Sequence, residues 1–167
     1  MKSILLIGFM GAGKSTVGKE LSRITGLPLV DLDEKISKKI QMPIHQYFDE
    51  FGEKNFRVIE SKLLEEFSQQ EIILATGGGA VVQMENRTIL KKQTTVYLSA
   101  DSQTLIQRIR ADKSHIRPLA QNSTDDQLVK LLVQREQLYQ KSANITIYTQ
   151  GKNQEEIARE ILKKLKK

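Results

Sequence analysis

The chain has no cysteine and no tryptophan, and no apolar run in its 167 residues approaches the length of a membrane span. Without cysteine there are no disulfides and no thiolate metal sites, which fits a reducing compartment, and we expect a cytoplasmic protein. The N-terminal stretch MKSILLI imitates a signal peptide only faintly, because it runs directly into glycines and a lysine without a small-residue cleavage site. We interpret it as a strand and predict no membrane partner.

Aromatic residues are scarce as well: phenylalanine and tyrosine together make up 5% of the chain. Because most of them fall on predicted helix core faces, they offer no stacking platform for bases. The formal net charge is +6, but residues 163–167 hold four lysines, which leaves about +2 for the rest. A basic tail suits a nucleic-acid-binding module, but cations are also favoured at helix C-termini. We predict a solvated helix end and no nucleic-acid partner.

Short apolar runs alternate with amphipathic stretches along the whole chain. This alternation predicts an α/β protein, with a parallel sheet covered by helices on both faces. We find no repeat, low-complexity segment or linker, so we expect one domain over residues 1–167. Gly26 is a predicted helix stop and Asn153 a predicted cap. The expected strands are 3–7, 29–32, 72–75, 95–98 and 145–148, and the expected helical stretches are 17–24, 56–67, 105–109, 128–138 and 157–165.

The segment GFMGAGKS, Gly8–Ser15, fits the pattern G-x-x-x-x-G-K-[ST] between a predicted strand and a predicted helix. Glycines let successive backbone N–H groups turn toward phosphate, and the helix N-terminus adds partial positive charge. Lys14 then reaches the outer phosphates, and the Ser15 hydroxyl ligates Mg²⁺. The pattern predicts a nucleoside triphosphate with Mg²⁺ as the ligand.

Two aspartates follow the second predicted strand, in the segment Asp31-Leu32-Asp33. Alternate residues of a strand share a face, so both carboxylates can point into one crevice at the carboxyl end of the sheet. One would support the metal's water shell and the other would take a proton from a substrate hydroxyl. The alternative is an ordinary strand end at which Asp33 caps the next helix.

Two arginines and three glycines complete the set of candidate residues. Arg57 borders an apolar helix face, and Arg135 interrupts another. Each is either a snorkelling side chain or a clamp for an anionic substrate, for which the guanidinium fork is well suited. Gly77–Gly79 end the third strand, as a loose turn or as a place where backbone closely approaches a ligand. Residues 111–125 are polar and long enough for a lid.

Taken together, these motifs resemble the shikimate kinase family, within the P-loop kinases related to nucleoside-monophosphate kinases. The resemblance covers essentially the whole length. Two departures are Ala120, where the family has a larger apolar residue, and Met10, at a position that is often proline. The matching segments are Gly8–Thr16, Asp31-Leu32-Asp33, GEKNFR at 52–57, Gly77–Gly79, Arg117-Pro118-Leu119, and Arg135 with Tyr139.

The resemblance implies a three-layer αβα P-loop fold with a five-stranded parallel sheet in the order 2-3-1-4-5. It implies a mobile lid at about 112–123 and an acceptor-binding region at about 33–60. The implied reaction moves the γ-phosphoryl group of MgATP to the 3-hydroxyl of shikimate, giving shikimate 3-phosphate and ADP. Shikimate and ATP are the expected partners, Mg²⁺ the expected cofactor, and a monomer the expected state.

The resemblance also assigns roles to individual residues. Asp33 would deprotonate the hydroxyl, while Lys14 and Arg117 would neutralise the transferring group; Arg110 would flank the adenine. The nucleotide would contact Gly11, Ala12, Gly13, Lys14, Ser15, Thr16, Arg110 and Arg117, the metal would contact Ser15 and Asp31, and shikimate would contact Asp33, Arg57, Gly77, Gly78, Gly79 and Arg135.

Two rival functions stay open at this point. A kinase for another small acceptor, such as gluconate or a nucleotide, shares the P-loop, but a nucleotide kinase needs a base-reading pocket, and Arg57 favours a compact carboxylated acceptor. A nucleic-acid-binding P-loop module would show salt-sensitive polynucleotide affinity that is lost with residues 163–167.

Overall fold

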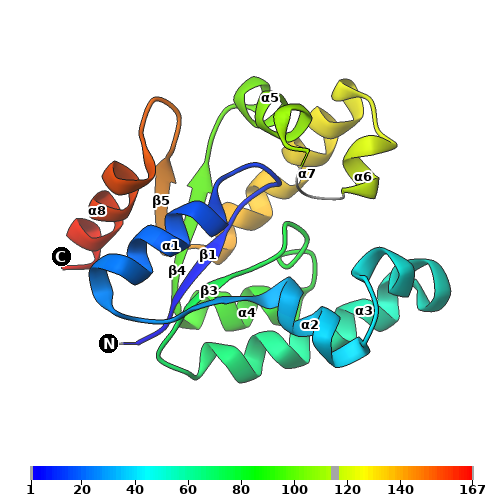
Figure 1. Cartoon of the computed structure of the whole chain (residues 1–167), viewed down its shortest axis with the longest axis horizontal. Helices are drawn as coiled ribbons and strands as arrows, with labels where there is room; N and C mark the ends of the chain where they lie inside the picture. Colours follow the sequence, from blue (N-terminus) through cyan, green and yellow to red (C-terminus); the bar gives the residue numbers. More distant parts are fainter. Residues whose placement is uncertain (1, 114–116, 167) are drawn as a thin grey trace.

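The computed structural model describes residues 2–113 and 117–166. Five strands form one all-parallel sheet in the order β2-β3-β1-β4-β5, as predicted (Figure 1). Each predicted strand exists, and the ends differ from prediction by at most one residue. The strands are β1 (Ile4–Ile7), β2 (Leu29–Asp31), β3 (Ile73–Ala75), β4 (Thr94–Ser99) and β5 (Ile145–Tyr148).

Helices cover both faces of the sheet, so the predicted three-layer arrangement is confirmed (Figure 1). Helices α1 and α8 pack together on one face, and α3, α4 and α7 form a continuous group on the other. Because β1 and β3 are buried on both faces, they contain only apolar residues. The helices are α1 (Lys14–Thr25), α2 (Leu32–Ile40), α3 (Ile44–Ser68), α4 (Met84–Lys92), α5 (Ser102–Ala111), α6 (Pro118–Gln121), α7 (Asp125–Ser142) and α8 (Gln154–Leu165).

Local signals account for the helix ends. Gly26 ends α1 with a φ of 80°, and the Asn153 side chain accepts the N–H of Glu156 to cap α8, so both predictions are confirmed. Within α3, Gly52 has a φ of 82° and a ψ of 164°, which breaks the helix into two segments. The second segment thereby starts one turn before Arg57.

Three helices, α2, α4 and α6, have no counterpart among the five expected helical stretches, although a helix after Asp33 belonged to the alternative interpretation of the two aspartates. Helix α4 buries only Asn86 and Leu90, and such a narrow apolar stripe produces little periodicity. Helix α6 lies inside the predicted loop 111–125 and spans four residues. Part of the predicted lid, residues 114–116, lies outside the described residues.

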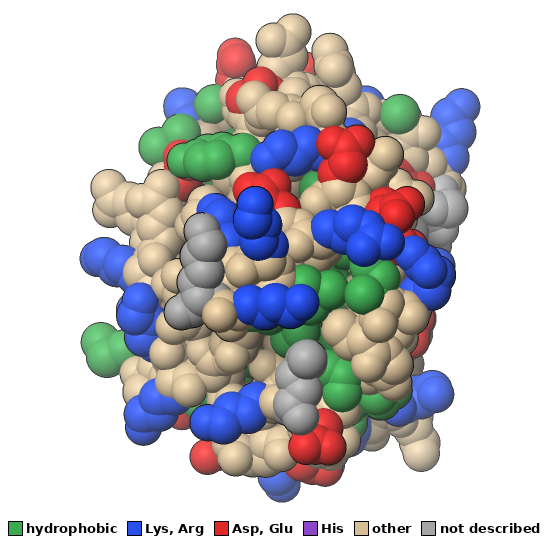
Figure 2. Space-filling view, turned by 90° about the vertical axis from the view of Figure 1, so that its left-hand side faces the viewer, with side chains coloured by type: hydrophobic (Ala, Val, Ile, Leu, Met, Phe, Trp, Pro, Cys, Tyr) green, Lys and Arg blue, Asp and Glu red, His purple; other side chains and the backbone are tan. Residues whose placement is uncertain are grey.

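The side of the molecule that carries α8 and both chain ends is shown in Figure 2, where lysines and arginines are spread among acidic and neutral side chains. Lys163 and Lys166 are exposed, and Lys164 lies 3.9 Å from the Glu160 carboxylate. Within the described residues, no helix is both long enough and apolar enough to cross a membrane.

Candidate active site

A cavity of about 560 Å³ opens beyond the carboxyl ends of β1, β2 and β3. Every predicted site residue except Arg110 lines this cavity. The phosphate-binding loop follows β1, Asp31 ends β2, Asp33 follows it in α2, and the glycine triplet follows β3. Helix α3 adds Arg57, and Arg117 and Arg135 approach from the C-terminal half of the chain.

The phosphate-binding loop requires glycine for backbone reasons. Gly11 and Gly13 have φ values of 77° and 92°, in the left-handed region that L side chains rarely adopt. Gly13 directly precedes α1, so the N-terminus of this helix opens into the cavity. Ser15 and Thr16 lie in the first turn of α1 and line the same cavity. The predicted anion-binding geometry is therefore present.

Lys14 turns back onto the loop that precedes it. Its Nζ donates to the carbonyl oxygens of Gly8 at 2.6 Å and Phe9 at 3.0 Å. Burial lowers the pKa of Lys14 to about 8; the Asp33 charge opposes this shift, and the Arg117 and Arg135 charges add to it. The ammonium group is thus poorly compensated, and a phosphate oxygen would supply the missing negative charge.

The two aspartates do not share a strand face as predicted, because β2 ends at Asp31. Asp31, rather than Asp33, is the N-cap of α2, and its Oδ1 accepts the N–H of Glu34 at 3.2 Å. Asp33 lies in the first turn of that helix, and both carboxylates still line the cavity. Burial, and secondarily the Asp31 charge, raise the pKa of Asp33, while Lys14 and Arg57 oppose the shift.

The glycine triplet has a different physical basis from the phosphate-binding loop, since none of its three residues has a positive φ. A Cβ atom on Gly77 would lie 2.8 Å from Asp33 Oδ1, and one on Gly79 would overlap the Arg57 guanidinium. A Cβ atom on Gly78 would lie 3.6 Å from Arg135 Nη1, an ordinary contact. The triplet is therefore a flat surface on which two functional side chains rest.

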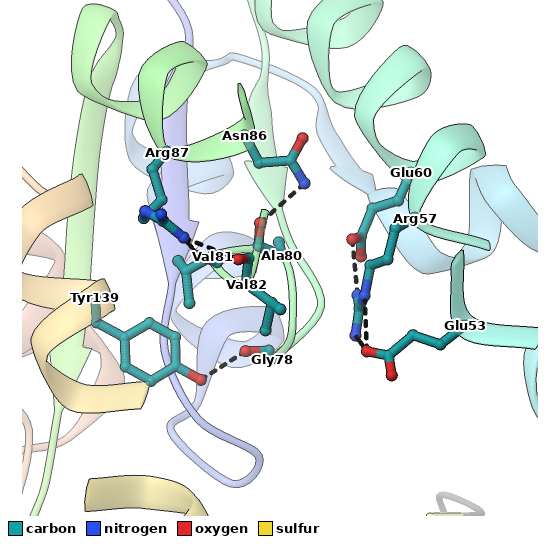
Figure 3. A network of polar contacts seen from close by, with 10 residues as sticks. All are labelled: Glu53, Arg57, Glu60, Gly78, Ala80, Val81, Val82, Asn86, Arg87 and Tyr139. Carbon is teal, nitrogen blue, oxygen red and sulfur yellow. Dashed lines mark hydrogen bonds and ion pairs between the residues drawn. The ribbon is translucent and has the colours of Figure 1, made fainter. Parts of the chain in front are cut away.

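Arg57 is 7% exposed, and its guanidinium is held from several sides (Figure 3). Nη1 donates to Glu60 Oε1 at 2.7 Å, and Nε and Nη2 both lie 3.3 Å from Glu53 Oε1. Its Cζ lies 5.3 Å and 5.8 Å from the ring centres of Phe56 and Phe48. This is a fixed cation rather than a snorkelling side chain.

Glu60 is a site residue that the sequence analysis missed. It is 1% exposed, lines the cavity and pairs with Arg57. Burial raises the pKa of the Glu60 carboxyl, and the charge of Arg57 opposes the shift. Its position three residues after a candidate arginine on a helix was the available signal, because side chains at that spacing are neighbours.

Arg117 and Arg135 complete the ring of cations around the cavity. Arg117 forms an ion pair with Asp112 at 3.1 Å, so the first residue of the predicted lid contacts a residue within it. Arg135 lies on α7, four residues before Tyr139, whose hydroxyl donates to the carbonyl of Gly78 at 2.6 Å. Together with Lys14 and Arg57, these two arginines come from four separate parts of the chain and converge on one space.

Arg110 does not line the main cavity, but lines a second one that shares Asp112 and Arg117 with it. Its guanidinium bonds Asp125 Oδ1, the Ala120 carbonyl at 2.6 Å and the Ser123 carbonyl at 2.8 Å, which ties α5 to the segment around α6. Arg108 lines the main cavity instead, and its Nη1 lies 3.3 Å from the Gly11 carbonyl. The predicted adenine contact by Arg110 stays a prediction, and in this structure the Arg110 guanidinium is occupied by Asp125 and the two carbonyls.

Comparison with known proteins gives concordant matches. The family model described as shikimate kinase matches residues 10–166. A shikimate kinase from Enterococcus faecalis is 43% identical, and the alignment covers 99% of each chain. The solved shikimate kinase from Acinetobacter baumannii, in complex with shikimate, has a TM-score of 0.90 and 37% identity over 99% of this chain and 93% of that one. The solved enzyme from Aquifex aeolicus has a TM-score of 0.84 and 35% identity, covering 98% and 96% of the two chains.

Proposed function

Because this chain belongs to the shikimate kinase family, we propose that its cavity is the place where MgATP and shikimate meet and that its residues act as follows. The predicted family and the predicted ATP-dependent kinase activity are both confirmed by the comparisons. The observation that carries the assignment of roles is the juxtaposition of Lys14, Asp33 and Arg57 around one space.

The nucleotide phosphates bind the loop formed by Gly11, Ala12 and Gly13 and the first turn of α1. Backbone N–H groups and the N-terminus of α1 hold the phosphate oxygens. Lys14 exchanges the carbonyls of Gly8 and Phe9 for the outer phosphates. The exchange replaces partial charges by full ones, which strengthens the hydrogen bonds of the ammonium group.

A magnesium ion fits next to Ser15 and Asp31, since hydroxyl and carboxylate oxygens are its preferred protein ligands and both side chains line the cavity. Among the described residues, no three His, Cys, Asp or Glu side chains gather into a metal-holding group. This fits an ion that takes most of its ligands from phosphate and water. When bound, the ion neutralises charge on the phosphate oxygens.

Asp33 acts as the general base. Its raised pKa makes the buried carboxylate a better proton acceptor than an exposed aspartate. As the 3-hydroxyl oxygen attacks the γ-phosphorus, Asp33 takes the hydroxyl proton, and the bond between that phosphorus and ADP breaks. The protein mainly positions the reactants and offsets charge, since the transition state is loose.

Arg57 and Arg135 bind the shikimate carboxylate. Arg57 is held in place by Glu60 and Glu53, so it is ordered before the substrate arrives. The N–H groups of the glycine triplet bind further oxygens of the acceptor. Arg117 closes over the transferring phosphoryl group with the segment 112–123, which excludes water as a competing acceptor. On closure, Arg110 would leave its present partners and flank the adenine, or else Arg108, which already lines the cavity, would take that place.

The direct test is a coupled assay of ADP release with shikimate, quinate, gluconate and AMP as alternative acceptors. We expect shikimate to give the highest kcat/KM, because the cavity pairs two arginines with a compact space. Faster turnover with gluconate or AMP at equal concentration would overturn the assignment, and a rate that does not depend on any acceptor would indicate an ATPase.

A further inference from the structure

Tyr139 lies behind the glycine triplet and does not line the main cavity. Its side chain is fully buried on α7, and its ring stacks on that of Tyr97 with centres 5.0 Å apart and planes at 25°. Its hydroxyl donates to the carbonyl oxygen of Gly78 at 2.6 Å (Figure 3). A short hydrogen bond from a fully buried ring fixes the direction of that carbonyl.

The rest of the loop after β3 is held in the same way (Figure 3). The Asn86 side chain donates to the Ala80 carbonyl at 2.9 Å, and Arg87 donates to the carbonyls of Val81 and Val82 at 2.8 Å each. Side chains of α4 and α7 therefore capture the carbonyls of the loop. Within the described part of the chain, Tyr139 is the one of these three side chains that bonds a carbonyl of the triplet itself.

The orientation of the Gly78 carbonyl determines that of the next N–H group. No cis peptide bond is present in the described residues, and in a trans peptide the C=O and N–H bonds point in opposite directions. Because the carbonyl points to Tyr139, which does not line the cavity, we infer that the N–H of Gly79, on the opposite side of the peptide, points into it. Within the described part of the chain, this N–H has no hydrogen-bond acceptor, although Gly79 lines the cavity.

Arg135 belongs to the same packed group. It lies four residues before Tyr139 on α7, so both side chains project from one face of the helix. Its Nη1 is 3.6 Å from the position of a Cβ atom on Gly78. The helix thus places a cation and a hydroxyl beside Gly78, and the Tyr139 hydroxyl also interacts with the Arg135 side chain.

We propose that Tyr139 is a positioning residue for the acceptor: its hydroxyl holds the Gly78–Gly79 peptide so that the Gly79 N–H donates to an acceptor oxygen beside Arg135. Tyr139 does not touch the substrate, and it takes no part in proton transfer. The proposal rests on the proposed function, since it assumes that the acceptor lies against Arg57, Arg135 and the triplet. Its contribution falls on acceptor binding rather than on nucleotide binding.

The test is Tyr139→Phe, which keeps the stacked ring and removes the hydroxyl. Freed from its restraint, the peptide can rotate, and the hydrogen bond from Gly79 to the acceptor weakens. We expect the KM for shikimate to rise about three- to tenfold, as for one neutral hydrogen bond, while the KM for MgATP and kcat stay within about twofold. A second readout is the amide signal of Gly79 in the labelled protein, which should shift on shikimate addition in the wild type and less in the variant.

Tyr97→Phe is the matched control, because it removes a hydroxyl from the other ring of the stacked pair, on β4. It should leave the KM for shikimate unchanged. The proposal is overturned if Tyr139→Phe keeps a normal KM for shikimate, or if both substrates weaken equally in it. A wild-type protein that does not use shikimate would refute the proposed function instead, so the two failures are distinguishable.

Discussion

Two glycine-rich loops follow adjacent strands of the sheet, and they need glycine for different physical reasons. In the loop after β1, Gly11 and Gly13 adopt left-handed backbone conformations. In the loop after β3, the triplet has ordinary φ values, but side chains rest directly on Gly77 and Gly79. The first loop is constrained by the shape of its own backbone, and the second by what packs against it.

This difference predicts which ligand each loop serves. A change in the first loop distorts the N–H cradle and should weaken the nucleotide. A change in the second displaces Asp33 or Arg57 and should disturb the acceptor or the chemical step, with the nucleotide still bound.

The largest effect is expected for Asp33→Asn. The amide keeps the shape of the side chain resting on Gly77 but cannot accept the hydroxyl proton. A positioned general base contributes about 10²–10⁴-fold, so kcat should fall within that range while MgATP binds normally by calorimetric titration. Near-normal kcat would reduce Asp33 to a packing residue of α2.

Asp31→Asn is the control for that experiment, because asparagine also caps helices well and the two aspartates lie two residues apart. It should raise the Mg²⁺ concentration that gives half-maximal rate and leave kcat at saturating Mg²⁺ closer to the wild type than Asp33→Asn does. Equal losses of kcat in the two variants would mean that their roles are not separate.

The next effect concerns the triplet itself. In Gly79→Ala, the new methyl group would overlap Arg57 and push its guanidinium out of place. Hydrogen bonds to charged groups contribute about 1.5–3 kcal/mol, so the KM for shikimate should rise roughly 10- to 100-fold. In Gly78→Ala, the nearest atom lies 3.6 Å away, and the KM should change by less than about threefold.

A double-mutant cycle decides whether Gly79→Ala acts through Arg57. If it does, adding Gly79→Ala to Arg57→Ala should cost little more than Arg57→Ala alone. Additive losses would show that the methyl group blocks the pocket itself. Equal effects at positions 78 and 79 would contradict the packing account of the triplet.

The sequence predicted the fold and most of the site because those features leave local patterns. Buried parallel strands appear as short apolar runs, and a phosphate cradle needs its glycines at fixed spacing. The role of each glycine in the triplet was not readable, since it depends on Asp33 and Arg57, which arrive from other elements. Glu60 was missed for a similar reason, because its role depends on its burial and its ion pair with Arg57, which no sequence pattern shows.

Where the sequence prediction was wrong, short-range hydrogen bonding decided the outcome. Asp31 caps α2 because its Oδ1 reaches the N–H of Glu34, and the strand therefore ends before Asp33. Short-range bonds also occupy Arg110, which contacts Asp125 and two backbone carbonyls, while its predicted adenine contact stays a prediction. Such choices between nearby partners leave no periodicity in a sequence.

A pH titration should distinguish the first loop from the second. The pKa of Lys14 is lowered to about 8 by burial, and bound phosphates should raise it again. Protonated Lys14 is the form that binds, so MgATP affinity is at full strength below pH 8 and falls as pH rises through 8. Between pH 7.5 and 9 we expect a loss of about tenfold, measured as Kd by calorimetry.

Lys14→Arg is the control for the titration, because arginine stays protonated throughout this range. Its MgATP affinity should be lower overall but nearly flat between pH 7.5 and 9. A wild-type affinity that does not change with pH would show that Lys14 is already fully charged at pH 9, and that its burial does not limit nucleotide binding.

The smallest effect is expected far from both loops, at the lysines that end α8. Lys163 and Lys166 are exposed, and the Lys164 pair with Glu160 is half-exposed, so their removal should cost little stability. Replacing Lys163, Lys164 and Lys166 together by glutamine should keep kcat and both KM values within about twofold.

Fluorescence anisotropy with single-stranded DNA, at low and high salt, separates this view from the nucleic-acid alternative. A salt-sensitive signal in the wild type that disappears in the variant would show that the basic end binds polyanions. A fall in kcat with unchanged DNA binding would instead show that the end of α8 affects catalysis. The assignment of nucleotide binding to the first loop and of acceptor binding to the second would then leave out a contribution from α8.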